Sequence, residues 1–170
     1  MSLFWRLALG GRKQFGKVLD MGAGDCRFLF GGKFKKYVGV EIDRNRSQGV
    51  ILPKNAKLIH NCAFKHRDNN YDACIGNPPY VRHHDIENPW KDDTVLRIKN
   101  DLGVSLNKHC NLYLYFLCLG LRRCFGSSMS TWNAMMLTMT GPSSSRPMLR
   151  RRGIITTMPP VNSNSFTNFT

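Results

Sequence analysis

Short apolar runs, each ended by a turn or a polar sequence, recur through the first half of the chain. The runs at 17–21, 37–42, 57–60 and 71–76 are too short for helices and predict buried strands. The longer segment 111–123 is apolar at most positions and predicts a largely buried helix. Strands that alternate with helical or loop connections indicate a parallel α/β sheet.

A further helix is predicted to follow the first of these strands. It is expected to open over 25–30, with Asp25 as its N-cap, because a carboxylate at that position can accept from the free amides of a first helical turn. Ligands of such sheets bind beyond the carboxyl ends of the strands. The polar or turn sequences 20–25, 41–43 and 77–80 follow three predicted strands, so we expect them on one rim.

Composition and charge narrow the function classes. The 170 residues are one domain's worth, and 42% of them are hydrophobic, which is enough for a core. No run approaches the roughly 18 apolar residues of a membrane-spanning helix. The formal net charge of +14 favours a polyanionic partner, above all nucleic acid. Six cysteines without a C-x-x-C pair indicate reduced thiols and a cytoplasmic protein.

The chain changes character after Asp101, because residues 102–170 contain no acidic side chain. One interpretation is a basic, flexible tail that binds nucleic acid. The other is an out-of-frame sequence in place of the true C-terminus, which the lost hydrophobic periodicity after Arg123 favours. In either case we expect a core over 1–125 and a basic, poorly ordered tail over 126–170.

The first strand runs into a glycine turn that suits a nucleoside ligand. Gly22 and Gly24 let the backbone turn sharply and approach a ligand closely. Glu41 ends the next strand, 21 residues after Asp20, where a carboxylate can accept both hydroxyls of a ribose. Arg27 stands where a dinucleotide fingerprint has its third glycine, so a ligand without phosphates fits better.

The most specific motif is Asn77-Pro78-Pro79-Tyr80, directly after a predicted strand. Two successive prolines fix φ and stiffen the loop. The Asn77 amide oxygen and the Pro78 carbonyl could accept the two N–H donors of an exocyclic amine. Tyr80 could stack on the ring that carries this amine.

Four segments together resemble a known family: V-L-D-M-G-A-G-D (18–25), V-E-I-D (40–43), D-A-C-I-G-N-P-P-Y-V-R (72–82) and N-L-Y-L-Y-F-L (111–117). They look like the motifs of S-adenosylmethionine-dependent methyltransferases, and the third resembles the catalytic motif of adenine-N6 DNA methyltransferases of restriction-modification systems. Their order is similar to that of the gamma subgroup. The resemblance implies a Rossmann-like class I methyltransferase sheet with helices on both faces, here incomplete.

The resemblance also implies the functional residues. The catalytic residues would be Asn77, Pro78, Pro79 and Tyr80. S-Adenosyl-L-methionine would be bound by Asp20, Gly22, Ala23, Gly24, Glu41, Ile42, Cys62 and Ala63. DNA would meet Arg82, His83, Lys91 and Lys108, and no metal is expected. Phe64 is either a core aromatic or part of the adenine pocket.

The implied activity is methylation of adenine N6 in double-stranded DNA, with the adenine flipped out of the duplex. A cognate restriction endonuclease could serve the same system without direct binding. Two alternatives stay open: methylation of RNA or of a protein glutamine by the same loop, and a non-catalytic remnant that binds nucleic acid through its charge.

The sequence also departs from the family pattern. Cys62 stands where the family commonly has an acidic residue, and the segment that caps the methionine end of the cofactor is shortened. Too few residues follow Arg123 for a DNA-recognition region, so the chain is expected to be truncated or frameshifted. Residues 153–159 resemble a later strand of the fold only faintly.

Overall fold

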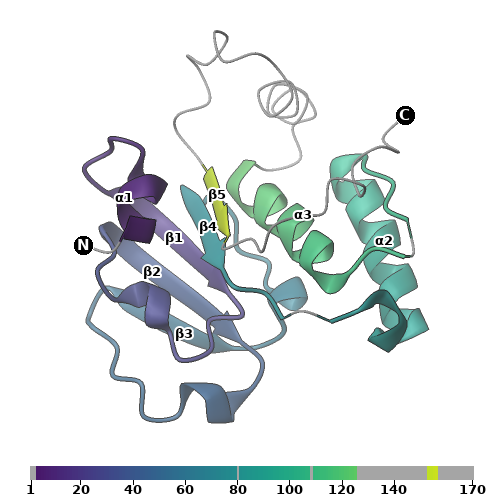
Figure 1. The fold of residues 1–170 in the computed structure, drawn as a ribbon, viewed down its shortest axis with the longest axis horizontal. Helices are drawn as coiled ribbons and strands as arrows, with labels where there is room; N and C mark the ends of the chain where they lie inside the picture. The colour runs from purple at the N-terminus through teal and green to yellow at the C-terminus, as the bar shows by residue number, and fades with distance from the viewer. Residues whose placement is uncertain (1–2, 80, 108, 126–152, 157–170) are drawn as a thin grey trace, which may run out of the picture.

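The computed structural model describes residues 3–79, 81–107, 109–125 and 153–156. Its centre is a five-stranded sheet in the order β3-β2-β1-β4-β5, and each neighbouring pair of strands runs parallel (Figure 1). The strands are β1 (Phe15–Met21), β2 (Phe34–Glu41), β3 (Ala56–His60), β4 (Ala73–Gly76) and β5 (Gly153–Thr156). The predicted parallel sheet and its first four strands are therefore confirmed.

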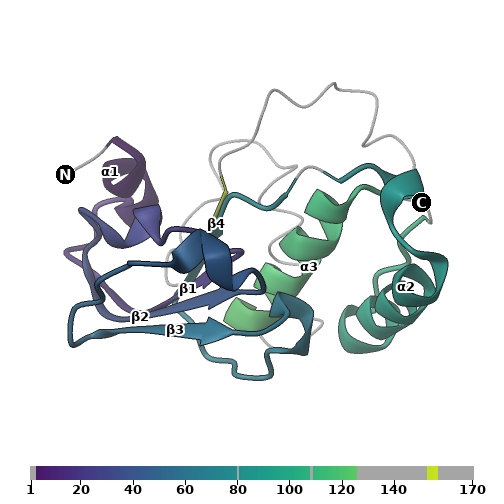
Figure 2. The same ribbon diagram turned by 90° about the horizontal axis from the view of Figure 1, so that it is seen from below.

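Within the described residues, three α-helices accompany the sheet: α1 (Leu3–Leu9), α2 (Asn88–Leu102) and α3 (Leu112–Phe125). Helix α3 confirms the buried helix that the sequence predicts, and it lies beside β4 and β5 (Figure 1). Helix α2 packs against α3 on the side away from the sheet, while α1 lies at the far side of the molecule (Figures 1 and 2).

The alternation of side chains along β1 divides the core in two, because successive residues of a strand point to opposite faces. Leu19 belongs to a cluster with the apolar residues of α2 and α3. Val18 belongs to a second cluster with Trp5 of α1. Both residues are at most 1% exposed, so β1 is buried on both faces, as expected of a central parallel strand.

The helix expected over 25–30 does not form. Only a single 3-10 turn, η1 (Arg27–Leu29), follows the glycine loop, and Asp25 accepts from the Arg27 amide (3.2 Å) without capping a helix. The residue before the turn, Cys26, has a left-handed backbone with φ of 57°. The physical reason is length: the 12 residues between β1 and β2 are about the minimum for a parallel crossover and leave no room for a packed helix.

Part of the region predicted to be a poorly ordered tail is a strand. Residues 153–156 form β5, which pairs with β4 from Ala73↔Gly153 to Gly76↔Thr156. This strand agrees with the faint resemblance of residues 153–159 to a later strand of the fold. The rest of that region, 126–152 and 157–170, lies outside the described residues. Among the described helices, none combines the length and apolarity needed to cross a bilayer.

Candidate functional site

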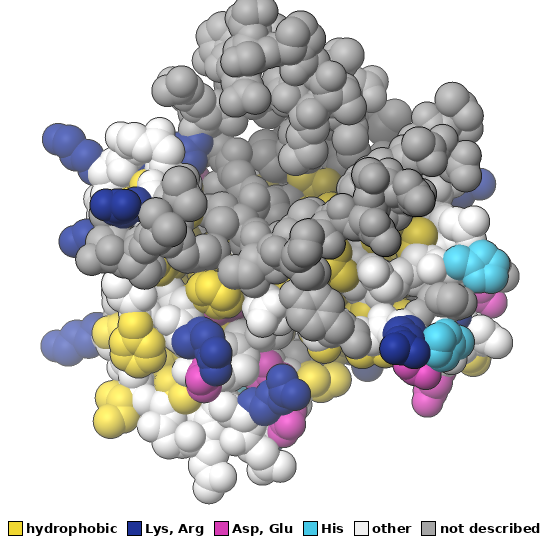
Figure 3. Space-filling model, viewed as in Figure 1, with side chains coloured by type: hydrophobic (Ala, Val, Ile, Leu, Met, Phe, Trp, Pro, Cys, Tyr) yellow, Lys and Arg dark blue, Asp and Glu magenta, His cyan; other side chains and the backbone are white. Residues whose placement is uncertain are grey.

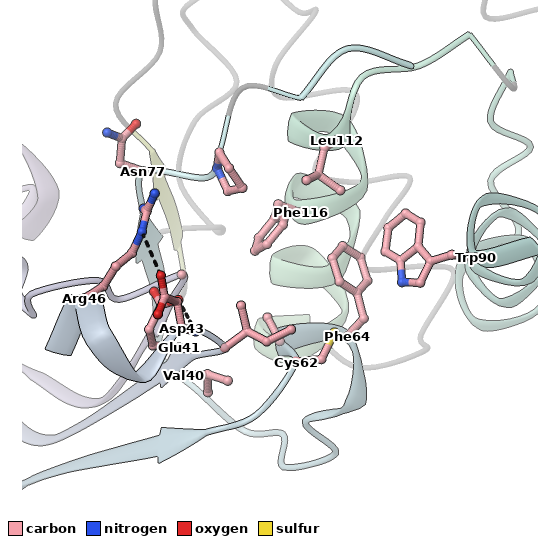
Figure 4. A pocket seen from close by; sticks show the side chains of 14 residues that line it. Val40, Glu41, Asp43, Arg46, Cys62, Phe64, Asn77, Trp90, Leu112 and Phe116 are labelled. Carbon is pink, nitrogen blue, oxygen red and sulfur yellow. Dashed lines mark hydrogen bonds and ion pairs between the residues drawn. The ribbon is translucent and has the colours of Figure 1, made fainter. Parts of the chain in front are cut away.

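The strand order places a crevice between β1 and β4. The chain builds β2 and β3 on one side of β1 and then returns to place β4 on the other side. At such a switch point the loops that follow the two strands diverge, and ligands bind at the carboxyl ends. A cavity of about 420 Å³ lies there (Figure 4). It brings together seven of the predicted residues: Gly22, Glu41, Ile42, Cys62, Ala63, Asn77 and Pro79.

The glycine loop after β1 bends over the end of β2. Gly22 and Gly24 have φ of +72° and +54°, and a Cβ atom on either would meet no other atom within 4 Å. The amides of Gly22 and Ala23 donate to the Val40 carbonyl at 2.9 and 3.1 Å. These positions therefore need glycine for their backbone conformation, and the loop keeps open space in front of it.

Glu41 holds this loop in place. Its side chain is only 5% exposed; Oε2 accepts from the Gly24 amide (2.7 Å) and Oε1 accepts from the Asp43 amide (2.9 Å). A carboxylate has about four acceptor positions, so two amides leave capacity for further donors. Because Glu41 also lines the cavity, that capacity is available to a ligand hydroxyl (Figure 4).

Asp20 is predicted from the sequence to bind the cofactor. It does not line the cavity but is fully buried, where the Tyr37 hydroxyl donates to its Oδ2 at 2.5 Å. Burial raises the pKa of Asp20 to about 7, although the bond from Tyr37 opposes this rise. Its Oδ1 has no hydrogen-bond partner among the described residues. Asp20 thus supports the end of β1 from inside the core.

An aromatic wall closes the other end of the cavity. The Phe64 ring meets the rings of Trp90 and Phe116 edge-on, at centroid distances of 5.0 and 4.9 Å. Phe64 is 5% exposed and lines the cavity, so it is both a core aromatic and a pocket residue. Ile42 faces the same space and is 71% exposed, so its side chain is accessible from the cavity.

Trp90 is one of the lining residues that are not predicted from the sequence. It lies in α2, a helix that is not predicted from the sequence. Pro89 in the first helical turn is the signal that could have placed this helix, because proline is favoured there. Even so, a helix prediction would not have brought Trp90 to the cavity, since that depends on how α2 packs against α3.

The loop after β4 presents the predicted catalytic motif to the same cavity. Asn77 and Pro79 are exposed and line the cavity, Pro78 is buried, and Tyr80 lies outside the described residues. The Pro79 carbonyl accepts from the Val81 amide (3.1 Å), and the Val81 carbonyl accepts from the first amide of α3 (3.2 Å). The loop is therefore held at both ends, by β4 and by α3.

The predicted DNA contacts are not all brought to the surface. Arg82 is exposed, and His83 begins the turn η4 (His83–Asp85). Lys91 is only 6% exposed, since it faces inward from α2, so the structure does not place it where a phosphate could reach it. Lys108 lies outside the described residues. On the face in Figure 3, Lys and Arg side chains lie along the left edge and in the lower half, where Asp and Glu lie beside them.

Comparison with known proteins assigns this arrangement to a family. Residues 31–143 match the family described as Eco57I restriction-modification methylase. Among solved structures, a candidate RNA methyltransferase from Pyrococcus horikoshii is 24% identical, with a TM-score of 0.40 over 45% of this chain and 43% of that chain. An S-adenosylmethionine-dependent methyltransferase from Thiobacillus denitrificans, solved with S-adenosyl-L-homocysteine, is 19% identical (TM-score 0.34; 45% and 36% covered).

A dimethyladenosine transferase from Plasmodium falciparum is 20% identical, with a TM-score of 0.35 over 55% of this chain and 35% of that chain. The chain thus spans less than half the length of each of these three structures. The family match, by contrast, covers more than half of the present chain and includes β2, β3, β4 and the catalytic motif.

Proposed function

Since the chain belongs to the Eco57I restriction-modification methylase family, we propose that it transfers a methyl group to N6 of adenine in DNA. The observation that carries this proposal is one shared cavity: Asn77 and Pro79 of the catalytic loop line the same space as Gly22 and Glu41. A group transfer requires its two reactants to be held side by side, and a common cavity does this.

Family membership confirms two expectations from the sequence. The fold is an α/β class I methyltransferase fold, and the cofactor is S-adenosyl-L-methionine. The cofactor supplies a methyl group on a positively charged sulfur. The cavity volume of about 420 Å³ is in the range of small-molecule sites.

The lining of the cavity fits the cofactor's three parts. The Glu41 carboxylate would accept the ribose hydroxyls, which matches its unused acceptor capacity. Ile42 and Phe64 would cover the adenine, because both offer apolar surface to the cavity. The open space before Gly22 and Gly24 would admit the amino-acid end, where a side chain on the loop would obstruct it.

The catalytic loop would orient the target amine. The Asn77 side-chain oxygen and the Pro78 carbonyl would accept its two N–H bonds, which leaves the nitrogen lone pair free to face the methyl group. Both oxygens would interact more strongly as the nitrogen becomes positive, so they would stabilise the transition state more than the ground state. Tyr80 would stack on the flipped base and hold its ring.

DNA is the proposed substrate on two grounds. A restriction-modification methylase family modifies DNA in such a system, and the net charge of +14 attracts a polyanion. The exposed Arg82 follows the catalytic loop directly, where it could meet a phosphate beside the flipped base.

The proposal is tested by incubating the chain with tritiated S-adenosyl-L-methionine and double-stranded DNA, followed by digestion to nucleosides. The expected label is in N6-methyladenine, and Asn77→Ala is expected to remove it. Label in cytosine, label only when RNA or protein replaces the DNA, or no label with the unsubstituted chain would each contradict the proposed reaction.

A further inference from the structure

Two residues of α2 contact Phe64. The Trp90 ring packs edge-on against the Phe64 ring, with centroids 5.0 Å apart and planes at 86°. The Arg97 guanidinium donates from Nη2 to the Phe64 carbonyl at 2.6 Å. Positions seven apart lie on one face of a helix, so a single face of α2 contacts both the ring and the backbone of Phe64.

The local structure of Phe64 makes its carbonyl available for this contact. Phe64 lies in the short turn η3 (Ala63–Lys65), which follows β3. Within the turn, the Cys62 and Ala63 carbonyls accept from the amides three residues later, at 2.9 and 3.3 Å. A 3-10 turn of three residues is weakly held by its own hydrogen bonds. A charged donor on the next carbonyl therefore adds substantially to its rigidity.

Phe64 is held on its cavity side as well. The Phe116 ring of α3 meets it at 4.9 Å and 80°, while Trp90 itself lines the cavity and meets Tyr115 at 5.8 Å (Figure 4). Phe64 thus sits between α2 and α3, and its ring position depends on both helices. Helix α2 lies on the side of α3 away from the sheet, so its contact with η3 reaches past α3 to the cofactor cavity (Figure 1).

We propose that Trp90 and Arg97 are positioning residues for the adenosine end of the cofactor, an inference that rests on the proposed function. They act through Phe64: Trp90 fixes the ring and Arg97 fixes the backbone that carries it. Loss of either contact lets η3 move, and the adenine loses part of its apolar wall. The effect is confined to the adenosine end, since neither residue approaches the glycine loop that would hold the amino-acid end.

The test is equilibrium binding of S-adenosyl-L-homocysteine to the full chain and its variants. Arg97→Ala is expected to weaken binding about tenfold, as for a lost charged hydrogen bond, and Trp90→Leu about threefold to tenfold, as for a lost aromatic pair. Arg97→Lys, which keeps one donor, is expected to recover most of the affinity. The matched control is Lys99→Ala, which removes an exposed positive charge from the same helix and should bind as the unsubstituted chain does.

A fragment of the ligand tests whether the lost affinity belongs to the adenosine end. 5′-Methylthioadenosine, which lacks the amino-acid end, should lose the same factor as S-adenosyl-L-homocysteine in Arg97→Ala. Binding of the complete ligand should also change the fluorescence of Trp90, and Trp90→Phe should keep the affinity and lose that change. Trp5 is buried on the opposite face of the sheet. Trp132, the third tryptophan, is present in both proteins, so the comparison with Trp90→Phe assigns the change to Trp90.

The outcomes distinguish this inference from the proposed function. If Glu41→Ala weakens binding and Arg97→Ala and Trp90→Leu do not, the cofactor site stands and the positioning role is wrong. A loss seen with the complete ligand and not with 5′-methylthioadenosine also overturns it. If the unsubstituted chain binds neither compound, both the inference and the proposed function are contradicted.

Discussion

The proposed cofactor half of the cavity and its proposed catalytic half are built in different ways. In the cofactor half, Glu41 is 5% exposed and accepts from two backbone amides, so the glycine loop is latched to the end of β2. In the catalytic half, Asn77 is exposed, and the stiffness of its loop comes from the two prolines that follow. The first half is fixed by hydrogen bonds, and the second by covalent restriction of the chain together with the hydrogen bond from α3 to the Val81 carbonyl.

This difference matches what each half would have to bind. A cofactor is the same in every turnover, so a closed hydrogen-bond network can be shaped for it in advance. A base that leaves a duplex has to reach its acceptors from outside, so those acceptors must stay accessible. Removing a side chain should therefore affect binding in the first half and reaction rate in the second.

The largest expected effect is on the catalytic half. Asn77→Ala should lower methyl transfer to DNA at least about 100-fold, because it removes an acceptor that faces the developing charge. Asn77→Asp, which keeps an oxygen at that position, should retain more activity than Asn77→Ala. Tritium incorporation at saturating cofactor measures both, and equal activity of Asn77→Ala and the unsubstituted chain would contradict the assigned role.

The cofactor half should respond in affinity. Glu41→Ala is expected to weaken binding of S-adenosyl-L-homocysteine by about 1.5–3 kcal/mol, because the ribose loses a charged acceptor and the Gly24 amide loses its partner. Asp25→Ala is the matched control, since Asp25 is an exposed carboxylate of the same loop that pairs with Arg27. Equal losses in the two variants would show a general charge effect and not a ribose contact.

Asp20, which is buried at the end of β1, should make the free energy of unfolding depend on pH. The pKa of Asp20 rises from 3.8 to about 7 on folding, chiefly through burial, so folding takes up a proton between these values. This contribution to stability is complete below about pH 4 and is lost as the pH rises through 7. Asp20→Asn keeps an acceptor for the Tyr37 hydroxyl and removes the titration.

Thermal unfolding from pH 4 to 8 measures this difference. Relative to that of Asp20→Asn, the melting temperature of the unsubstituted chain should fall by several degrees between about pH 4 and pH 7 and change little above pH 7. Parallel curves for the two proteins would show that Asp20 does not change its charge on folding.

The smallest expected effect concerns the surface next to the catalytic half. Arg82→Ala should weaken non-specific DNA binding by about threefold and reduce the salt dependence by about one counterion, as for one lost phosphate contact. Lys35→Ala is the control. Lys35 is exposed at the amino end of β2, whereas the cavity lies at the carboxyl ends of the strands. The same loss in both variants would indicate attraction by net charge alone.

Much of the fold could be predicted because its signals are local. The strands were found from short apolar runs, and Glu41 and Asn77 were placed on one rim because the carboxyl ends of parallel strands share an edge. The prediction for 25–30 was wrong because a cap residue indicates where a helix can start and not how much chain is available for it. That limit comes from the 12-residue distance to β2.

The parts of the site that escaped prediction depend on packing between distant elements. Trp90 reaches the cavity only because α2 packs on α3, and Lys91 turns inward for the same reason. Asp20 occupies the motif position of a cofactor residue, yet its side chain points to the face where Tyr37 lies. A sequence pattern gives the position along a strand, while the contact depends on which face that position occupies.

The most direct test of the account is one calorimetric titration of S-adenosyl-L-homocysteine into three proteins: the unsubstituted chain, Glu41→Ala and Asn77→Ala. The account predicts that Asn77→Ala binds as the unsubstituted chain does, while Glu41→Ala binds about tenfold to a hundredfold more weakly. Equal weakening in both variants, or none in Glu41→Ala, would contradict the division of the cavity into a cofactor half and a catalytic half.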